Sequence, residues 1–172
     1  MNAQLRQRIA VSLLAVSAAG FSAWKASEGY TDHAVIPTEG DVPTIGHGST
    51  HYEDGRAVKM GDRITAPRAE LLARNLMTQD EQRFAVSLPG VKLHQAEFDL
   101  YMDFVGQYGI GTWRQSSIRR ELLARNYIQA CKSLLKYRYA ARFDCSTPGN
   151  KRCWGVWSRQ LKRYEQCMAV QS

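Results

Sequence analysis

The sequence predicts an α+β fold, with a small β-rich lobe, a larger helical lobe and a cleft between them. Two stretches of different composition within the 172 residues indicate this division. Residues 30–52 are rich in Gly, Pro, Thr and Asp and include the β-prone piece Val-Pro-Thr-Ile at 42–45, which favours loops and a small hairpin. From Thr65 onward, apolar residues recur at helical spacing. At this length we expect one globular domain with a sizeable core.

Capping and breaking residues delimit the expected helices. Thr65 is an N-cap candidate with Pro67 in the first turn, and Pro89-Gly90 ends the helix that follows. Either Ser116 or Ser117 can cap a later helix. We therefore expect helices over residues 68–88, 93–109, 118–126, 127–142 and 158–170.

An apolar run, residues 9–24, precedes the β-rich lobe. It contains no charged residue, follows Arg6 and Arg8, and ends before Lys25. This layout predicts a membrane-directed apolar helix and two parts of the chain, an N-terminal segment 1–26 and a globular domain 27–172. As a helix the run spans about 24 Å, which is short of the roughly 30 Å hydrocarbon core.

Four behaviours fit this N-terminal run. It can be a signal peptide cleaved near Ala19 or Ser22, a permanent anchor, a signal-arrest-release segment that inserts and later leaves the bilayer, or a buried core helix. The run is rich in Ala, Ser and Gly, so its apolar character is modest. Weak hydrophobicity favours the third behaviour, because extraction from the membrane must be thermally accessible.

Positive charge is concentrated in the last third of the chain. The formal net charge is +7, and residues 114–172 alone carry +10, from thirteen Lys and Arg against three acids. Such a surface favours a polyanionic partner, either nucleic acid, anionic lipid or an anionic cell wall, and charge alone does not choose among them.

All four cysteines lie near the C-terminus. Four cysteines permit three pairings, and we expect Cys131–Cys167, which would join two predicted helices, with Cys145–Cys153, which would close a short loop. A zinc site is the competing interpretation, but CxxC spacing is absent. Disulfides indicate an oxidising compartment.

Glu28 is the first candidate for a functional residue. It stands where the apolar run gives way to the glycine-containing β-rich segment, a position from which a carboxyl group can face a cleft. A general acid is a carboxyl group that partial burial keeps protonated near neutral pH. His33, His47 and His51 are close in sequence, but they fall in a glycine-rich loop without a helical frame, so we expect no metal site.

Three segments, in order, resemble the phage-type lysozyme, or endolysin, family. The first combines Glu28-Gly29 with residues 40–48, Gly-Asp-Val-Pro-Thr-Ile-Gly-His-Gly, and is similar to the active-site β lobe of that family. The second is residues 104–117, which run from Phe-Val-Gly-Gln-Tyr-Gly to Ser-Ser, and the third is residues 155–165, which begin Gly-Val-Trp-Ser-Arg.

The resemblance covers nearly the whole chain. Cys131 and Cys167 match cysteines of periplasmic members, and the N-terminal run is similar to that of signal-arrest-release endolysins related to the T-even phage lysozyme. It implies a lysozyme-like fold, hydrolysis of the β-1,4 bond between N-acetylmuramic acid and N-acetylglucosamine in peptidoglycan, and lysis of the host cell. It implies no cofactor.

Residue roles follow from the resemblance, position by position. Glu28 would be the general acid, and Thr44 would help to position the attacking water. Gln107 would line the cleft beside Glu28. Arg159 would pair with Glu28 or contact the substrate.

The second acid departs from the family pattern. The family carries an acidic residue nine positions after the Glu, where this sequence has Pro37. The carboxylate must then come from Asp41, Glu39 or Asp32. We favour Asp41, which follows Gly40 and precedes Thr44 by three residues. An inverting glycosidase needs its two carboxyl groups about 6.5–9.5 Å apart to admit a water.

Two other functions compete with the lysozyme. A lytic transglycosylase acts on the same bond with a single catalytic acid, and a non-catalytic, membrane-tethered wall-binding protein needs none. The expected export signal and paired cysteines disfavour a nucleic-acid binder. We therefore expect a monomer in the periplasm, initially tethered to the host inner membrane, with peptidoglycan as its partner.

Overall fold

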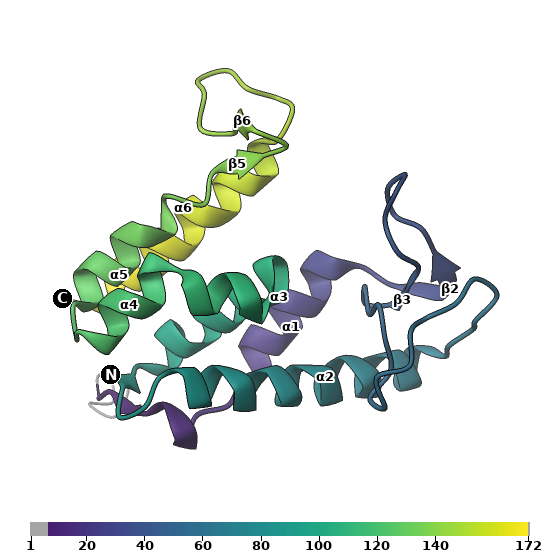
Figure 1. The fold of residues 1–172 in the computed structure, drawn as a ribbon, viewed down its shortest axis with the longest axis horizontal. Coiled ribbons are helices and arrows are strands. Elements are labelled where there is room, and N and C mark those ends of the chain that lie inside the picture. Colours follow the sequence, from purple (N-terminus) through teal and green to yellow (C-terminus); the bar gives the residue numbers. More distant parts are fainter. Residues whose placement is uncertain (1–6, 172) are drawn as a thin grey trace. The chain divides into compact units, whose positions relative to one another are not determined.

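The structure, a computed structural model, describes residues 7–171 and divides into two compact units. One unit is Ser17–Gln82. The other combines residues 7–16 with residues 83–171, so it contains both the beginning and the end of the described chain. Figure 1 shows the order of the elements along the chain.

The unit Ser17–Gln82 holds the predicted β-rich lobe. It contains α1 (Ala18–Glu28), β2 (Thr31–Val35), β3 (Thr44–Gly46) and the first part of α2 (Ala66–Ser87). The expected hairpin is confirmed, because β2 and β3 pair antiparallel. The core behind this hairpin consists of Ala34, Ile45, Val58, Ile64, Ala69 and Leu72.

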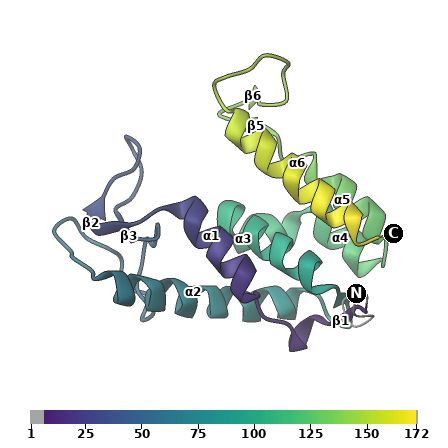
Figure 2. The ribbon, with the colours of Figure 1, turned by 180° about the vertical axis from the view of Figure 1, so that it is seen from behind.

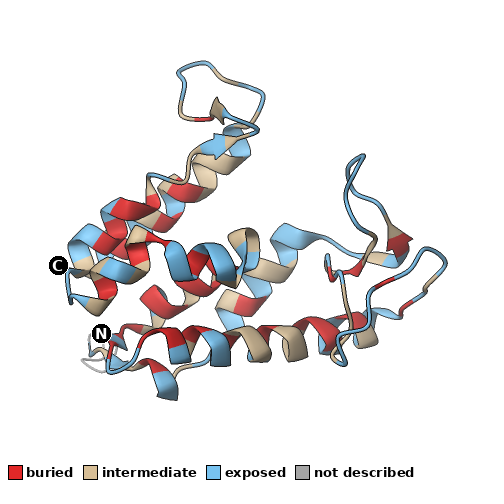
Figure 3. Cartoon of the chain, viewed as in Figure 1, coloured by how far each residue is buried: buried red, intermediate tan, exposed pale blue. Residues whose placement is uncertain are grey.

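The second unit is mainly helical. It contains α3 (Gln95–Gln115), α4 (Ser117–Leu123), α5 (Tyr127–Leu134) and α6 (Trp154–Ala169). Helix α5 packs between α4 and α6, as Figure 2 shows, and α3 contacts both α4 and α6. Figure 3 shows buried residues concentrated on the facing sides of these helices.

Trp113 lies at the centre of the helical core. It is fully buried, and the rings of Phe84, Tyr101 and Phe104 lie with centroids 4.7, 5.6 and 6.2 Å from its ring. Its indole N–H donates a hydrogen bond of 2.8 Å to Ser87 Oγ, so the polar end of the side chain is satisfied inside the core.

The predicted caps of the central helices are confirmed. The Thr65 side chain accepts a hydrogen bond from the Arg68 N–H, and the Ser116 side chain accepts one from the Arg119 N–H. Gly109 (φ +82°) interrupts α3 and lets the chain turn where a helical backbone cannot continue.

The prediction of one apolar helix over residues 9–24 is wrong. The chain first forms β1 (Ile9–Ala10), which pairs antiparallel with β4 (Lys92–Leu93), and then the 3₁₀ turn η2 (Val11–Leu13). Helix α1 begins only at Ala18, because the Ser17 side chain caps it by accepting a hydrogen bond from the Gly20 N–H.

Burial and pairing explain why this segment is not one helix. The edge of β4 offers backbone partners to β1, and the Val11 N–H donates to the Val91 carbonyl at 3.1 Å. Val11 and Val16 are buried in the process. Residues 1–6 of the predicted N-terminal segment lie outside the described residues. No helix within residues 7–171 has the length and apolar character needed to cross a bilayer.

Arg8 fastens this N-terminal strand to the helical unit. Its guanidinium pairs with the fully buried carboxylate of Glu97 at 3.1 Å and donates to the Gln171 side chain at 2.7 Å. It also lies 3.6 Å from the centroid of the Tyr127 ring. Glu97 additionally accepts the His94 backbone N–H at the start of α3, so one carboxylate joins both ends of the described chain to this helix.

The expected helix over residues 127–142 is too long. Helix α5 ends at Leu134, and β5 (Tyr139–Ala140) and β6 (Phe143–Asp144) form a hairpin instead. The hairpin turn uses left-handed backbone at Ala141 and Arg142, with φ +45° and +65°, which is incompatible with a continuing helix.

Both predicted disulfides are confirmed. Cys131–Cys167 joins α5 to α6, and Cys145–Cys153 closes the loop that follows the β5–β6 hairpin. Helix α6 starts at Trp154, directly after the second bridge and four residues before the expected start at residue 158.

Candidate functional site

Glu28 is the last residue of α1. Gly29 follows with φ +72°, a left-handed backbone that glycine adopts without steric cost, and the chain turns there into β2. The exposed Glu28 carboxylate lies over Gly48, since a Cβ atom built on Gly48 would be 3.5 Å from Glu28 Oε2. The end of α1 therefore meets the loop after β3.

His47 joins these two segments directly. Its Nδ1 atom donates a hydrogen bond to the Gly29 carbonyl, and because a carbonyl oxygen only accepts, Nδ1 must carry the proton. The Tyr30 ring lies beside the imidazole, with centroids 5.6 Å apart. The sequence singled out His47 only as a weak metal candidate, and its hydrogen bond to the residue after Glu28 had no local signal.

Thr44 begins β3, opposite Val35 in the hairpin. Its hydroxyl donates a 3.4 Å hydrogen bond to the Val35 carbonyl. Ile45, the next residue, is fully buried, and side chains alternate across a strand, so Thr44 lies on the face away from this core.

Gly46 fixes β3 against α2. Its φ is +64°, and a Cβ atom at this position would lie 2.9 Å from Ala69 Cβ. Both the left-handed backbone and the close approach require glycine. This contact fixes the position of β3, and with it Thr44 and His47, along the axis of α2.

The three candidates for the second acid lie in two environments. Asp41 and Glu39 are exposed in the loop 36–43, where the Asp41 N–H donates to the Thr38 carbonyl at 3.0 Å. Asp32 instead pairs with His33 at 2.6 Å and Arg63 at 3.8 Å, and the His33 hydrogen bond lowers the pKa of Asp32. Asp41 lies on the loop before β3 rather than on the strand itself.

A groove with a volume of about 950 Å³ runs along α1 and the start of α2. Phe21, Pro67 and Leu71 give it an apolar floor, and Lys25 pairs with Glu70 across it at 2.7 Å. His47 is one of its walls, but Glu28, Asp41 and Thr44 do not line it. The groove is therefore separate from the candidate catalytic residues.

The loop after β3 is held by an ion pair that the sequence did not suggest. Arg68 on α2 donates two hydrogen bonds, 2.8 and 2.7 Å, to the Glu53 carboxylate. Asn75 adds a third at 2.9 Å. The Arg68 hydrogen bonds, with that from Asn75, lower the pKa of Glu53 to about 2 despite its partial burial.

Gln107 and Arg159 belong to the helical unit. Gln107 lies on α3, half-buried, and its Oε1 atom is buried without a hydrogen-bond donor among the described residues. Arg159 on α6 pairs with Asp103 at 2.5 Å, and Arg163 binds the same carboxylate through Nε at 2.7 Å. The roles assigned to Gln107 and Arg159 stay predictions.

Asp103 is a residue that sequence reasoning missed. Burial by itself would raise its pKa, but the hydrogen bond from Arg159 and the charge of Arg163 outweigh it and lower the pKa. No group of three or more His, Cys, Asp or Glu side chains within residues 7–171 has an arrangement that could hold a metal ion.

Comparisons with known proteins agree on one family. The Phage lysozyme family model matches residues 25–167. An endolysin of Salmonella phage P22 is 30% identical over 131 residues, which are 76% of this chain and 88% of that protein. An endolysin of Bacillus phage B103 is 31% identical over 156 residues, or 88% of this chain, but these span only 51% of that longer protein.

A solved structure gives the fold. A crystal structure of a P22 lysozyme mutant superposes with a TM-score of 0.71 at 24% identity, covering 91% of this chain and 99% of that one. The fold is thus lysozyme-like, mostly helical with small sheets, as the resemblance implied.

Proposed function

The chain belongs to the phage lysozyme family, and we propose on that premise that it is an endolysin that hydrolyses the β-1,4 bond between N-acetylmuramic acid and N-acetylglucosamine in peptidoglycan. One observation carries this proposal. The family model covers Glu28, and the last residue of α1 presents its carboxylate to the Gly46-His47-Gly48 turn of the Thr-Ile-Gly-x-Gly segment.

In this proposal each candidate residue has a chemical role. Glu28 protonates the glycosidic oxygen as the bond breaks. Asp41 activates a water on the opposite side of the sugar, and Thr44 helps to orient that water. Gln107 and Arg159 contact the substrate. These steps need only carboxyl, hydroxyl, amide and guanidinium groups, so no cofactor takes part.

The composition of the loop 36–43 supports Asp41 as the second acid. The family position is Pro37, which has no titratable group, and Asp32 is engaged with His33 and Arg63. Asp41 and Glu39 remain as exposed carboxylates on the same loop. Asp41 is nearer to Thr44 in sequence, and Glu39 is its matched alternative.

The test is turbidity clearing of outer-membrane-permeabilised bacteria by the oxidised protein, followed by analysis of the released muropeptides. We expect Glu28→Gln and Asp41→Asn to lose about 10²–10⁴-fold in rate while keeping the melting temperature of the wild type. Glu39→Gln is the matched control and should stay active. The products should carry new reducing ends.

Other results lead to other functions. Anhydro-muramyl ends would identify a lytic transglycosylase, which the replacement of the family acid by Pro37 makes the main rival. If the Asp41→Asn variant is active and the Glu39→Gln variant is inactive, the role of second acid is assigned to Glu39. A wild-type protein that is folded but does not clear the cells would favour the non-catalytic wall-binding protein.

The proposed location is the periplasm, with the N-terminal segment initially in the host inner membrane. The support is the charge-free run 9–24 between Arg8 and Lys25, together with two disulfides that suit an oxidising compartment. In the folded protein the same run supplies β1, Val11 and Val16 to the helical unit. Tethering and folding of this run therefore exclude each other, and we propose that the tethered form is inactive.

A further inference from the structure

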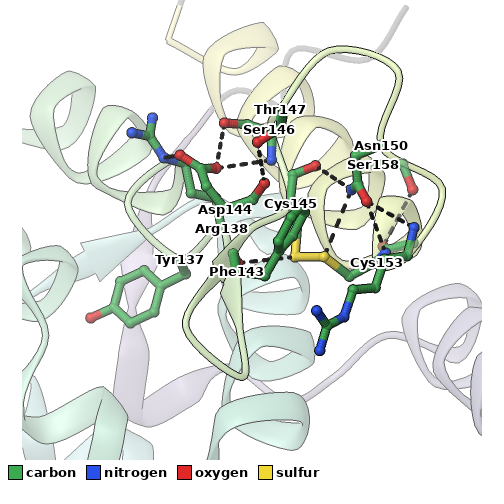
Figure 4. The surroundings of a disulfide bond; sticks show 12 residues. Tyr137, Arg138, Phe143, Asp144, Cys145, Ser146, Thr147, Asn150, Cys153 and Ser158 are labelled. Atoms are coloured by element: carbon green, nitrogen blue, oxygen red, sulfur yellow. Dashed lines mark hydrogen bonds and ion pairs between the residues drawn. A yellow bond between two sulfur atoms is a disulfide. The ribbon is translucent and has the colours of Figure 1, made fainter.

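A small element closed by a disulfide leads into α6. We call residues 136–154 the cationic loop; it comprises the β5–β6 hairpin, the segment closed by Cys145–Cys153 and Trp154, the first residue of α6 (Figure 4). The Cys145 N–H donates to the Arg138 carbonyl at 2.8 Å. Asn150 spans the closed segment, donating to the Cys145 carbonyl at 3.0 Å and accepting the Arg152 N–H at 2.8 Å.

The cationic loop carries five basic residues and one acid. That acid, Asp144, is bonded within the loop: it accepts hydrogen bonds from the Ser146 N–H and hydroxyl and pairs with Arg138 at 3.1 Å. Its negative charge is thus compensated by groups of the loop itself. The side chains of Arg142, Lys151 and Arg152 stay exposed, and their positive charge faces solvent.

Two aromatic side chains accompany these cations. Tyr139 is 54% exposed and Trp154 is 52% exposed, unlike Trp113, which is completely buried in the core. Arg142 occupies the tip of the hairpin turn with φ +65°, a left-handed position that glycine or asparagine normally fills in such turns. The loop therefore keeps a cation at its tip despite the backbone cost.

We propose that the cationic loop docks onto an anionic phospholipid surface. Each Lys or Arg near such a surface contributes about 1 kcal/mol, or roughly fivefold, to binding, and Trp and Tyr rings lie favourably at the headgroup level of a bilayer. Figures 1 and 2 show the hairpin and its loop standing beyond the helices of their own unit, a shape that suits a flat surface. None of the loop residues lines the groove along α1 and α2.

The proposal is independent of catalysis, and the test is vesicle partitioning of the oxidised full chain. We expect strong partitioning onto vesicles containing phosphatidylglycerol at low ionic strength, weak partitioning at high ionic strength, and little onto pure phosphatidylcholine. The triple variant Arg142→Gln/Lys151→Gln/Arg152→Gln should bind the phosphatidylglycerol vesicles about 100-fold more weakly.

A matched triple variant controls for net charge. Arg114→Gln/Arg120→Gln/Lys132→Gln removes three exposed charges from the helices of the same unit and should partition like the wild type. Unchanged melting temperatures and unchanged cell clearing show that both variants fold. Glu28→Gln should also partition normally, so failure of the proposed reaction does not affect this test.

Three results would overturn the proposal. Equal losses in the two triple variants would mean that overall charge, not the cationic loop, attracts the membrane. Equal partitioning of the wild type onto neutral and anionic vesicles would exclude recognition of the net negative charge of the lipid headgroups. Loss of binding to purified cell-wall sacculi by the loop variant, with vesicle binding intact, would assign the loop to the anionic wall polymer.

Discussion

His47 occupies the variable position of the Thr-Ile-Gly-x-Gly segment and donates a hydrogen bond to the carbonyl of Gly29, the residue after Glu28. The Glu28 side chain itself is exposed and lies over Gly48. A carboxylate on the last residue of a helix, followed by a glycine with positive φ, is only weakly held in one orientation by its own backbone. His47 supplies such a restraint from the neighbouring loop.

The first prediction concerns this restraint. His47→Leu removes the donor to the Gly29 carbonyl, so kcat should fall about fivefold, the amount that one net hydrogen bond of about 1 kcal/mol represents. His47→Asn can place an amide N–H near the Nδ1 position and should recover most of the rate. Steady-state clearing kinetics measure both. Equal rates for the Leu and Asn variants would show that the hydrogen bond does not position Glu28.

The second prediction at the residue scale is a pH dependence of stability. The folded-state pKa of Glu53 is about 2, below its ordinary value of 4.5, because Arg68 and Asn75 hydrogen-bond to the carboxylate. A lowered carboxylate pKa stabilises the folded state above about pH 4.5, and this contribution is lost as the pH falls toward 2.

Glu53→Gln removes that contribution. Because the pair is partly exposed, we expect the variant to be about 1–2 kcal/mol less stable at neutral pH, and the difference from the wild type to shrink between pH 4.5 and 2. Denaturant melts at several pH values measure it. A difference that stays constant over this range would contradict the assignment.

Among the elements, the two disulfides differ in the length of chain they close. Cys131 and Cys167 are 36 residues apart and bridge two helices, whereas Cys145 and Cys153 are 8 residues apart and close a surface loop. A longer closed loop removes more conformational entropy from the unfolded chain.

The third prediction follows from these loop lengths. Replacing both cysteines by Ser should cost about 4 kcal/mol for the Cys131–Cys167 pair and about 2.5 kcal/mol for the Cys145–Cys153 pair. Loss of the second pair should also weaken binding of the cationic loop to anionic vesicles, because the loop loses its closure. Denaturant unfolding of the two double variants gives the comparison, and an equal cost would indicate that the entropy of loop closure does not set the stabilisation by either bridge.

At the scale of the whole molecule, the N-terminal run has two alternative surroundings. In the folded protein it forms β1, η2 and the start of α1, with Val11, Val16 and Phe21 buried. In the proposed tethered form the same residues would lie in the bilayer. Several residues of the run, including Ser12, Ala15 and Ala19, are exposed in the folded protein, so they can be changed without altering its core.

The fourth prediction uses these exposed positions. The charge-free variant Ser12→Leu/Ala15→Leu/Ala19→Leu should hold the segment more firmly in the membrane, since each Leu favours insertion by about 0.3–0.6 kcal/mol. Host lysis should be delayed, while the purified folded protein should clear permeabilised cells at the wild-type rate. Unchanged lytic timing in cells would refute release from the membrane as the controlling step.

Local signals explain what the sequence predicted well. Thr65 and Ser116 cap helices through atoms three residues away, and Gly109 interrupts α3 through its own backbone. The hairpin around Thr44 follows from β-prone residues between turn residues. Each of these features depends on neighbours in the chain, so the two caps, the break in α3 and the hairpin were predictable.

The sequence by itself thus determined the α+β order of elements, the pairing of the cysteines and the membership of the family. Only the tertiary structure decided that Ile9 pairs with Leu93, that Arg8 binds Glu97 across 89 positions, and that Arg159 meets Asp103. An edge strand or a buried carboxylate selects its partner through pairing and desolvation in the folded state. Those free energies arise only when distant segments come together. A local pattern such as the apolar run 9–24 therefore predicts one helix, where the folded chain forms β1, η2 and only then the start of α1.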